Sequence, residues 1–182
     1  MPAEAITLRN AFNGETFVFP ADPGTAEVTR FDVRLEPGGS GGGNALRHVH
    51  PLAEERLTVR AGCLVVTIAG EEHRVVAGQS VVVPRGAAHF FRNGGSEAAE
   101  ITIAFSPPQR HRGFFMAFAA LAERRPQWFS AKGDPHLLLI ALHLHRFAGH
   151  LYLAGPPVWL QKLVFAVLAP VARLCGYRGI NP

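Results

Sequence analysis

The chain contains little cysteine. Its 182 residues include only Cys63 and Cys175, which lie far apart. This excludes a disulfide framework, and neither cysteine belongs to a CxxC pair of the kind that binds metal. A reducing compartment is the simpler inference. The first residues, Met1–Ala5, show no basic segment followed by an apolar run, so they are unlike a secretory signal. We therefore expect a cytoplasmic protein.

Charge is also scarce. Charged residues make up 18% of the chain and hydrophobic residues 48%, and only Lys132 and Lys162 are lysines. The formal net charge is +4, but the basic residues are scattered without a dense run. Because nucleic-acid binding usually requires a clustered basic patch, we expect no nucleic-acid partner. A chain of this length can bury a core of useful size and fits one domain with an appendage.

Residues 5–106 are predicted to form short strands. Segments rich in Val, Ile, Thr and Phe alternate with turns rich in Gly and Pro, such as 37–39 and 93–95. Many short strands at regular spacing favour an antiparallel sandwich or barrel. The glycine-rich stretch 38–43 precedes a pair of histidines, and we expect it to form a mobile loop at the entrance of a site.

The pattern changes after Pro107 and Pro108, where apolar residues recur every three or four positions, as on one face of a helix. Three helices are predicted, over 113–125, 135–154 and 156–175. Pro170 should kink or end the last of them. We therefore divide the chain into a barrel with N-terminal strands, residues 1–108, and an apolar helical extension, residues 109–182.

The two apolar segments of the extension approach the length that a bilayer requires. They contain His143, Arg146 and Lys162, however, and charges at bilayer depth are costly. We prefer a helical hairpin that packs on the barrel, pairs with a second subunit or lies on a membrane surface. A homodimer is the expected assembly, and peripheral membrane contact through 136–175 is the alternative, so the protein is cytoplasmic or membrane-associated.

Three histidines of the extension, His136, His143 and His150, recur every seven residues. On one helix they would form a stripe. A stripe of this kind is typical of a second metal site or a pH-sensitive interface. We favour a simpler interpretation, in which the three residues fill the polar side of an apolar helix.

Four residues in the first half have the character of metal ligands: His48, His50, Glu55 and His89. In a strand, residues two apart point to the same face, so His48 and His50 can reach one ion together. Three imidazoles and a carboxylate suit Fe, Mn, Ni, Zn or Cu, and the ligand types do not select among these metals. We expect one divalent transition metal here.

Two glycine-punctuated stretches contain the four residues. The first is Gly42-x5-His48-x-His50-x4-Glu55-x6-Gly62, and the second is Gly78-x5-Pro84-x-Gly86-x2-His89-x3-Asn93. They resemble the paired signature motifs of the cupin superfamily, with every signature position filled and a short spacer between them. The resemblance covers roughly residues 25–106. It implies a mainly β fold, the cupin double-stranded β-helix or jelly-roll barrel, and a structural role for Asn93.

Strand alternation predicts which side chains face the barrel interior. If Glu55 points inward, then Leu57 and Val59 do so too, and Phe91 follows His89. The predicted pocket lining is apolar and consists of Phe31, Val33, Leu57, Val59, Phe91 and Ile103. No second acid or base is expected beside the ligands.

The resemblance implies two functions. Three histidines and a glutamate resemble the centres of cupin dioxygenases, in which Glu55 could serve as a base as well as a ligand. The first hypothesis is a metal-dependent oxygenase that acts on a small apolar or aromatic molecule. The second is a non-catalytic cupin that binds or senses a metal or small ligand, with C-terminal helices that contact a dimer partner, another protein or a membrane.

Overall fold

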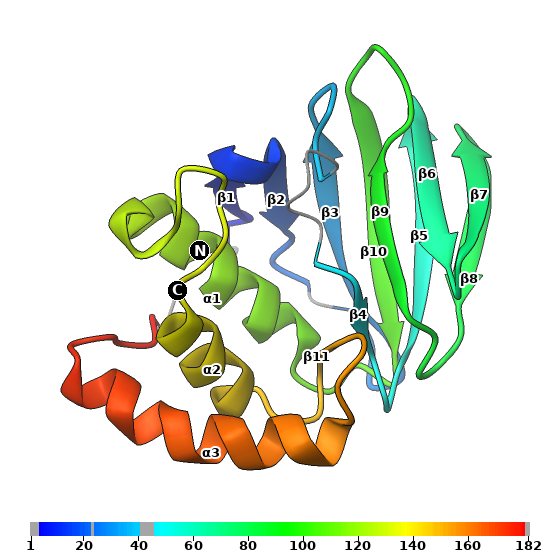
Figure 1. The fold of residues 1–182 in the computed structure, drawn as a ribbon. Coiled ribbons are helices and arrows are strands. Elements are labelled where there is room, and N and C mark those ends of the chain that lie inside the picture. The colour runs from blue at the N-terminus through cyan, green and yellow to red at the C-terminus, as the bar shows by residue number, and fades with distance from the viewer. Residues whose placement is uncertain (1–3, 23, 41–45, 181–182) are drawn as a thin grey trace.

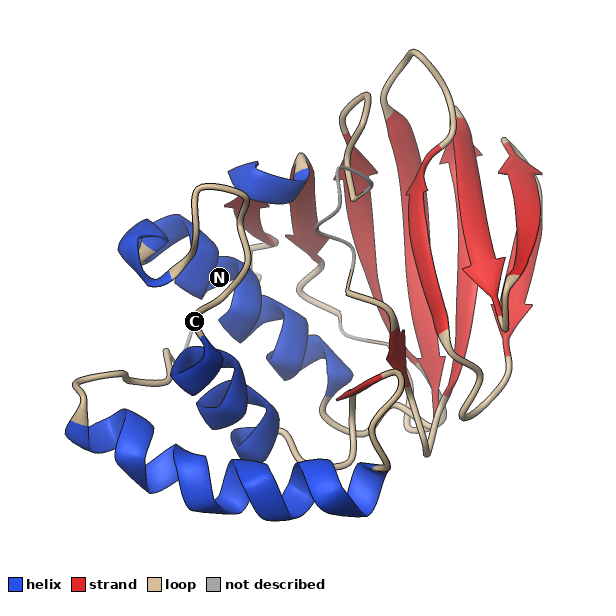
Figure 2. Cartoon of the chain, in the orientation of Figure 1, coloured by secondary structure: helices blue, strands red, loops and turns tan. Residues whose placement is uncertain are grey.

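The computed structural model describes residues 4–22, 24–40 and 46–180. Its strands form two antiparallel sheets, and the helices lie to one side of them (Figures 1 and 2). The strand order is β1-β2-β3-β10-β5-β8 in the six-stranded sheet and β11-β4-β9-β6-β7 in the five-stranded sheet. The predicted mainly β jelly roll with a C-terminal helical region is confirmed. The strands are β1 (Ile6–Asn10), β2 (Glu15–Phe19), β3 (Thr29–Leu35), β4 (His48–Val49), β5 (Glu54–Ala61), β6 (Cys63–Ile68), β7 (Glu71–Val76), β8 (Ser80–Val83), β9 (His89–Asn93), β10 (Ala99–Ser106) and β11 (Tyr152–Leu153).

The barrel strands follow the alternation seen in the sequence. Every second residue of β10 is buried, and β10 pairs with β3 on one side and β5 on the other. Its inward side chains, such as Ile101 and Ile103, therefore fill the space between the sheets. The turn from β5 to β6 requires Gly62, whose φ is +75°. A Cβ atom there would lie 2.7 Å from the carbonyl oxygen of Ala98, so only glycine fits.

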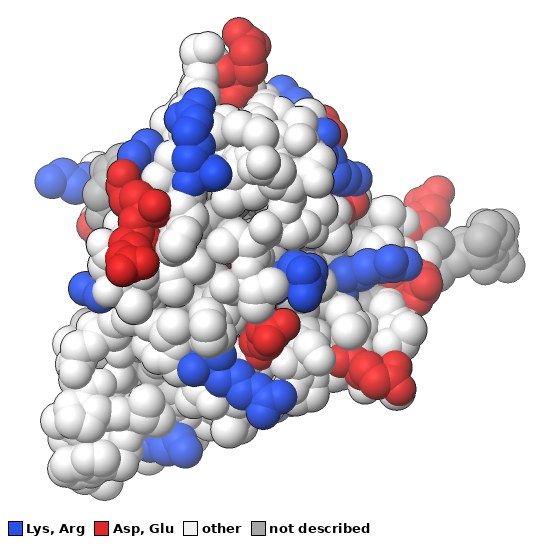
Figure 3. Space-filling model, turned by 90° about the vertical axis from the view of Figure 1, so that its right-hand side faces the viewer, with Lys and Arg blue, Asp and Glu red and all other residues white. Residues whose placement is uncertain are grey.

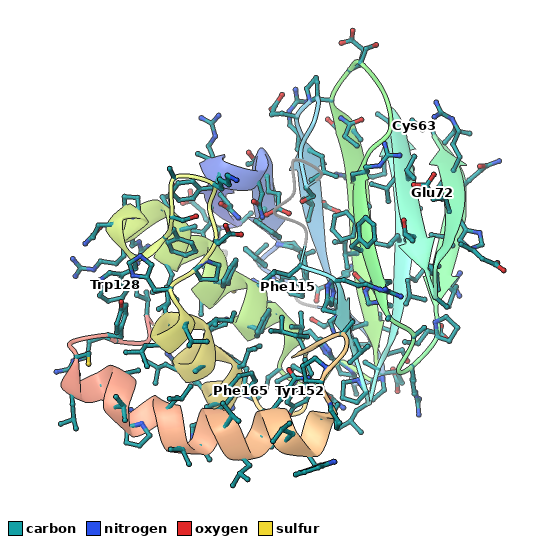
Figure 4. All side chains as sticks on the ribbon, viewed as in Figure 1. Cys63, Glu72, Phe115, Trp128, Tyr152 and Phe165 are labelled. Carbon is teal, nitrogen blue, oxygen red and sulfur yellow. The ribbon has the colours of Figure 1, made fainter. Side chains whose placement is uncertain are left out.

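The helix α1 (His111–Arg124) packs on the N-terminal strands β1 and β2. Its side chains Met116, Ala119 and Ala120 belong to the same buried cluster as Phe17 and Phe31 of the barrel. Phe115 points from α1 toward the sheets (Figure 4), and its ring centroid lies 5.1 Å from that of Phe31. The domain boundary after residue 108 stays a prediction, and the apolar core extends across it.

One helix prediction was wrong in its bounds. The second predicted helix, 135–154, is the shorter α2 (Leu137–Arg146), because the chain turns through Gly149 at φ +96° and then forms β11 beside β4. The third helix, α3 (Val158–Leu174), agrees closely with the predicted range 156–175; it does not end at Pro170, and the alternative expected there, a kink, stays a prediction. Ala169 and Ala172, on either side of the proline, are buried against Leu142 of α2. This packing holds the helix together where a backbone hydrogen bond is missing.

The strand β11 and the helix α3 share a core. Tyr152 and Phe165 lie close together beneath the barrel (Figure 4) and belong to one buried cluster. Among the helices described here, none combines the length and the apolarity needed to cross a bilayer.

Candidate metal centre

The structure brings His48, His50, Glu55 and His89 together. β4 and β9 pair with His48 opposite His89, and Glu55 is the second residue of β5. The four ligand atoms all lie within 4.8 Å of one another. Two atoms bound about 2.1 Å from one ion lie at most about 4.2 Å apart, so a small contraction would close the group around a metal. These four residues, which we call the quartet, are a group that could hold a metal ion.

The imidazole rings of the quartet are oriented by backbone carbonyl groups. Each Nδ1 lies close to one: 2.7 Å from that of Leu46 for His48, 2.6 Å from that of His150 for His50, and 2.9 Å from that of Ala87 for His89. An Nδ1 that donates its proton leaves the Nε2 lone pair for a metal. His48 and His50 are therefore held in the tautomer that a metal ligand requires. At His89 the Nε2 atom also faces an oxygen, Oε2 of Glu55 at 2.7 Å, so an ion would displace a proton there.

Glu55 closes the quartet from the opposite sheet. Its side chain is 1% exposed, and its Oε2 lies 2.7 Å from Nε2 of His89 and 3.4 Å from Nε2 of His50. Among the described residues, none hydrogen-bonds to Nε2 of His50, although this atom is buried. A buried nitrogen that lacks a hydrogen bond is costly, and a metal ion would satisfy it. The donor set therefore fits a transition metal.

The electrostatics of the quartet favour a metal as well. Burial alone would raise the pKa of Glu55, but the nearby imidazoles of His50 and His89, the latter hydrogen-bonded to the carboxylate, outweigh it and hold that pKa well below its usual value. Burial lowers the pKa of His48, and the nearby His89 and His50 lower it further. Burial also works against the charged form of His89, yet Glu55 raises its pKa. The carboxylate is thus ionised and His48 is neutral, as metal ligands must be.

The motif glycines and Asn93 have structural roles. Gly86 donates its N–H to the carbonyl oxygen of His50, at 2.9 Å, and so joins the two motifs. Asn93 accepts a hydrogen bond from the N–H of Gly95 and donates to three carbonyl groups, so it caps the turn as expected. Gly42, the first residue of the first motif, and residues 41–43 of the predicted mobile loop lie outside the described residues.

A second group of histidines surrounds His50 and comes from the extension. The ring of His111 stacks on Phe105 with centroids 4.1 Å apart, and it meets the rings of His50 and His150 edge-on, at 5.1 and 5.0 Å. Burial lowers the pKa of His111 and of His150 to about 4, so both rings are neutral at pH 7. Sequence reasoning did not place His111 beside the quartet, because its position depends on how α1 docks.

The proposed histidine stripe does not form. His136 lies just before α2, His143 lies within it, and His150 follows in the turn before β11. His143 is buried among the rings of Phe114, Phe118 and Phe147, and burial lowers its pKa to about 3. The interpretation as polar filler on an exposed helix face was therefore wrong for His143, which fills an aromatic core.

A cavity of about 110 Å³ lies between the barrel and the helices, and His48 forms part of its wall. Two of the predicted lining residues, Phe91 and Ile103, face it. The other four, Phe31, Val33, Leu57 and Val59, are buried in the barrel core. The helices complete the wall with Phe114, Phe115 and Phe118 of α1, Ile140 of α2, and Leu151.

The cavity is not purely apolar. Glu15 and Ser40 also line it, and burial raises the pKa of Glu15 to about 7 although hydrogen bonds from Ser40, Asn10 and Asn13 act in the opposite direction. The expectation that no second acid or base accompanies the ligands was wrong. Glu15 begins a strand outside the two motifs, and no local pattern marks it as a cavity residue.

Comparison with known proteins places this geometry in a family. Residues 31–105 match the family model of the cupin domain. They form a cupin domain. Two curated relatives align with it: the tetracenomycin polyketide synthase protein TcmJ of Streptomyces glaucescens, 28% identical over 107 residues, and germin-like protein 3-8 of Oryza sativa subsp. japonica, 42% identical over 103 residues. The alignments cover 59% and 53% of this chain.

The chain covers 69% of the Streptomyces relative and only 42% of the rice relative. Among solved structures, an RmlC-like cupin from Shewanella frigidimarina is similar with a TM-score of 0.50 and 16% identity, over 60% of this chain and 89% of that one. At this identity the likeness concerns the fold alone. The comparisons thus support a cupin domain over residues 31–105.

Proposed function

We propose that the protein is a metal-dependent oxygenase that acts on a small apolar or aromatic molecule. The observation that carries this proposal is the position of His48, which belongs both to the quartet and to the wall of the cavity. A molecule in the cavity would therefore lie beside the metal. Catalytic metal sites need such an open side, whereas structural sites are closed.

The metal would supply Lewis acidity or redox chemistry at the cavity wall. The residues of the chain do the rest. Phe91, Ile103 and Phe115 exclude water and position the substrate by apolar contact. Glu55 holds a negative charge beside the ion; because its pKa is low, it is a good ligand and a weak base.

The cavity limits the size of the substrate. Its volume of about 110 Å³ is smaller than the roughly 150 Å³ of an apolar cavity that admits benzene. A short chain therefore fits within the walls, whereas a single ring or a larger substrate would have to extend partly out of the cavity. The Streptomyces relative, a polyketide synthase protein by name, supports a small-molecule substrate.

The test combines metal content with turnover. Purified protein is analysed for bound metal beside a His48→Ala/His50→Ala variant, and oxygen uptake is followed with catechols, diketones and flavonols. We expect metal and uptake in the wild type and neither in the variant. Glu72→Gln is the matched control, because Glu72 lies on β7 at the far edge of the molecule (Figure 4). Equal metal content in the wild type and the double variant would refute the metal site.

A second candidate is a non-catalytic cupin that senses a metal or small ligand through its extension. One observation favours it: the extension reaches the quartet directly, through the carbonyl of His150 on His50 and through β11 on β4. Tightly bound metal without oxygen uptake, together with slower hydrogen exchange in β11 and α2 on metal binding, would favour this function over catalysis.

A further inference from the structure

A cluster of polar side chains lies in the cavity wall, on strands and turns outside the metal quartet. It consists of Asn10, Asn13, Glu15 and Ser40, and we call it the polar corner. Oε2 of Glu15 accepts a hydrogen bond from Asn10, at 3.1 Å, and Oε1 accepts one from Ser40. The side chains of Asn13, Glu15 and Ser40 face the cavity.

The polar corner has more acceptors than donors. A carboxylate offers about four lone-pair sites, and at most three of those on Glu15 are met, by Asn10, Ser40 and Asn13. Among the described residues, nothing donates to Oδ1 of Asn10 or Oδ1 of Asn13, which are both buried. Asn10 is only 2% exposed. Buried acceptors without donors destabilise a protein, so this corner is suited to a ligand that brings a hydrogen-bond donor.

The corner and the quartet share one cavity. His48 of the quartet, Glu15 and Ser40 of the polar corner, and aromatic residues such as Phe17 and Phe115 all line it. We propose that the polar corner binds a hydroxyl or amine group of a ligand that lies in the cavity beside the metal. The corner has this role only if the cavity is the substrate pocket, so the proposal rests on the proposed function.

The proposal defines a class of ligand: a small ring or short chain that carries an N–H or O–H donor. The pKa of Glu15, raised to about 7 by burial, supports it. A carboxyl group that titrates near neutral pH can accept a proton from a bound hydroxyl and return it, which the low pKa of Glu55 does not allow.

The test compares phenol with toluene, which have nearly the same shape and differ in a donor. Binding is measured by calorimetric titration to the protein as purified and after removal of metal by chelation. We expect phenol to bind at least about tenfold more tightly than toluene, since a hydrogen bond to a charged acceptor is of that order. The preference should persist without metal.

Two variants test whether Glu15 causes the preference for phenol over toluene. Glu15→Leu removes the acceptor at similar volume and should bind phenol and toluene equally, whereas Glu72→Gln should bind as the wild type does. If Glu15→Leu fails to fold, Glu15→Gln carries the same test and should lose part of the preference. An unchanged preference in the folded variant would overturn the proposal, and so would a preference that disappears with the metal, because phenol would then bind to the ion.

A different result would refute the proposed oxygenase function. Oxygen uptake that is absent with every substrate, while phenol still depends on Glu15, would refute the oxygenase and leave the polar corner in place. If neither ring binds to the wild type, the cavity is not a pocket for small rings and the polar corner loses its role. Metal content, measured on the same samples, reports on the quartet alone.

An independent observation concerns the outer surface of α3. Seven large apolar side chains on it are exposed: Trp159, Leu160, Leu163, Val164, Val167, Val171 and Leu174. At 3.6 residues per turn they fall within about 140° of the helix circumference. The opposite side of α3, with Phe165 and Ala169, is buried against α2. The helix is therefore apolar on the side that none of the residues described in the structure covers.

The charged residues of α3 itself are of one sign. No Asp or Glu follows Asp134 in the sequence, and Lys162 and Arg173 are the charged residues of α3. On the barrel, by contrast, acidic and basic side chains are interspersed (Figure 3). In a two-fold dimer of α3 on α3, the cations would approach one another without an acid on either helix. An anionic lipid surface complements both the apolar residues and the cations.

We infer that the α3 surface lies on an anionic membrane. Full-length protein should float with vesicles of phosphatidylglycerol and phosphatidylcholine, and much less with phosphatidylcholine alone. Leu163→Gln/Val167→Gln should abolish flotation, whereas Glu72→Gln should leave it unchanged. Absence of flotation, or a concentration-dependent dimer in sedimentation that the same double variant dissociates, would overturn the inference; the second result would support the homodimer expected from the sequence.

Discussion

Glu55 and Glu15 are both buried carboxyl groups of this protein, and their pKa values move in opposite directions. Glu55 lies among imidazoles, which hold its pKa well below the usual value. Glu15 lies among the uncharged side chains of Ser40, Asn10 and Asn13, and burial raises its pKa to about 7. Both receive hydrogen bonds, so the difference lies in the charge that each one meets.

This difference assigns the two groups to different tasks. A carboxylate that stays ionised beside three ring nitrogens is suited to hold a cation. A carboxyl group that titrates near pH 7 is suited to exchange protons or to bind a donor. Pairs of groups whose surroundings separate their pKa values in this way are typical of functional sites.

The largest expected effect is a difference in metal affinity between variants of the two glutamates. Glu55→Gln removes a ligand and the negative charge that offsets the cation, so metal affinity should fall by more than the roughly 10–100-fold loss caused by changes around a ligand. Glu15→Gln should retain the metal. Dissociation constants for zinc, measured by competition with a chelator, test this. An equal loss of zinc affinity in both variants would show that Glu55 and Glu15 do not differ in metal binding.

The next effect concerns pH and stability. The folded-state pKa of Glu15, about 7, lies above the value of about 4.3 for a free glutamate. As pH rises, the unfolded chain loses this proton first, so stability falls between about pH 4 and 7 and then levels off. The loss is on the order of 3 kcal/mol.

Glu15→Gln removes this dependence. The free energy of unfolding in urea is measured for both proteins at pH 5 and pH 8. The variant's value minus that of the wild type should be larger at pH 8 than at pH 5 by about 2–3 kcal/mol. Parallel pH profiles would mean that Glu15 titrates as an ordinary glutamate, and the contrast with Glu55 would disappear.

A smaller effect should come from Gln161, which supports the quartet through β11. Its side chain accepts a hydrogen bond from the N–H of Leu153 and donates to the carbonyl groups of Leu153 and Pro156. Gln161→Leu should loosen β11 and weaken metal binding by about tenfold. The control is Arg173→Gln, at an exposed residue near the other end of α3. Unchanged metal affinity would show that the quartet is independent of the extension.

The smallest effect is expected at His143, a buried imidazole without a carboxylate partner. Burial lowers its pKa to about 3, so the ring is neutral and packs as an aromatic side chain. His143→Leu should change the free energy of unfolding by less than about 1.5 kcal/mol, the value of one hydrogen bond, and should leave the metal in place. A large loss of metal would make His143 part of the centre.

The sequence predicted those features that depend on local patterns. Alternation along β5 and β10 identified the inward faces, and two motifs identified the quartet. Alternation distinguishes one face of a strand from the other, but it does not distinguish a core position from a cavity wall. For this reason Phe31 and Leu57 were expected in the pocket and instead fill the core.

Features that depend on contacts between remote segments could not be predicted. β11 forms because Tyr152 pairs with Val49, and nothing in a two-residue segment within an apolar run marks it as a strand. The polar corner depends on Ser40 reaching Glu15, and the neutral rings of His111 and His150 depend on the docking of α1. Each of these arises from tertiary packing, which overrides local preference.

The hydrogen bond between Nδ1 of His50 and the carbonyl of His150 joins residues 100 positions apart. A ribosome that adds about 5–20 residues each second takes on the order of 5–20 s to span that distance. During this interval His50 of the nascent barrel lacks its hydrogen bond to the carbonyl group of His150. An ion held by the quartet would therefore reach its mature coordination only after the extension, which contributes no ligand, has been synthesised.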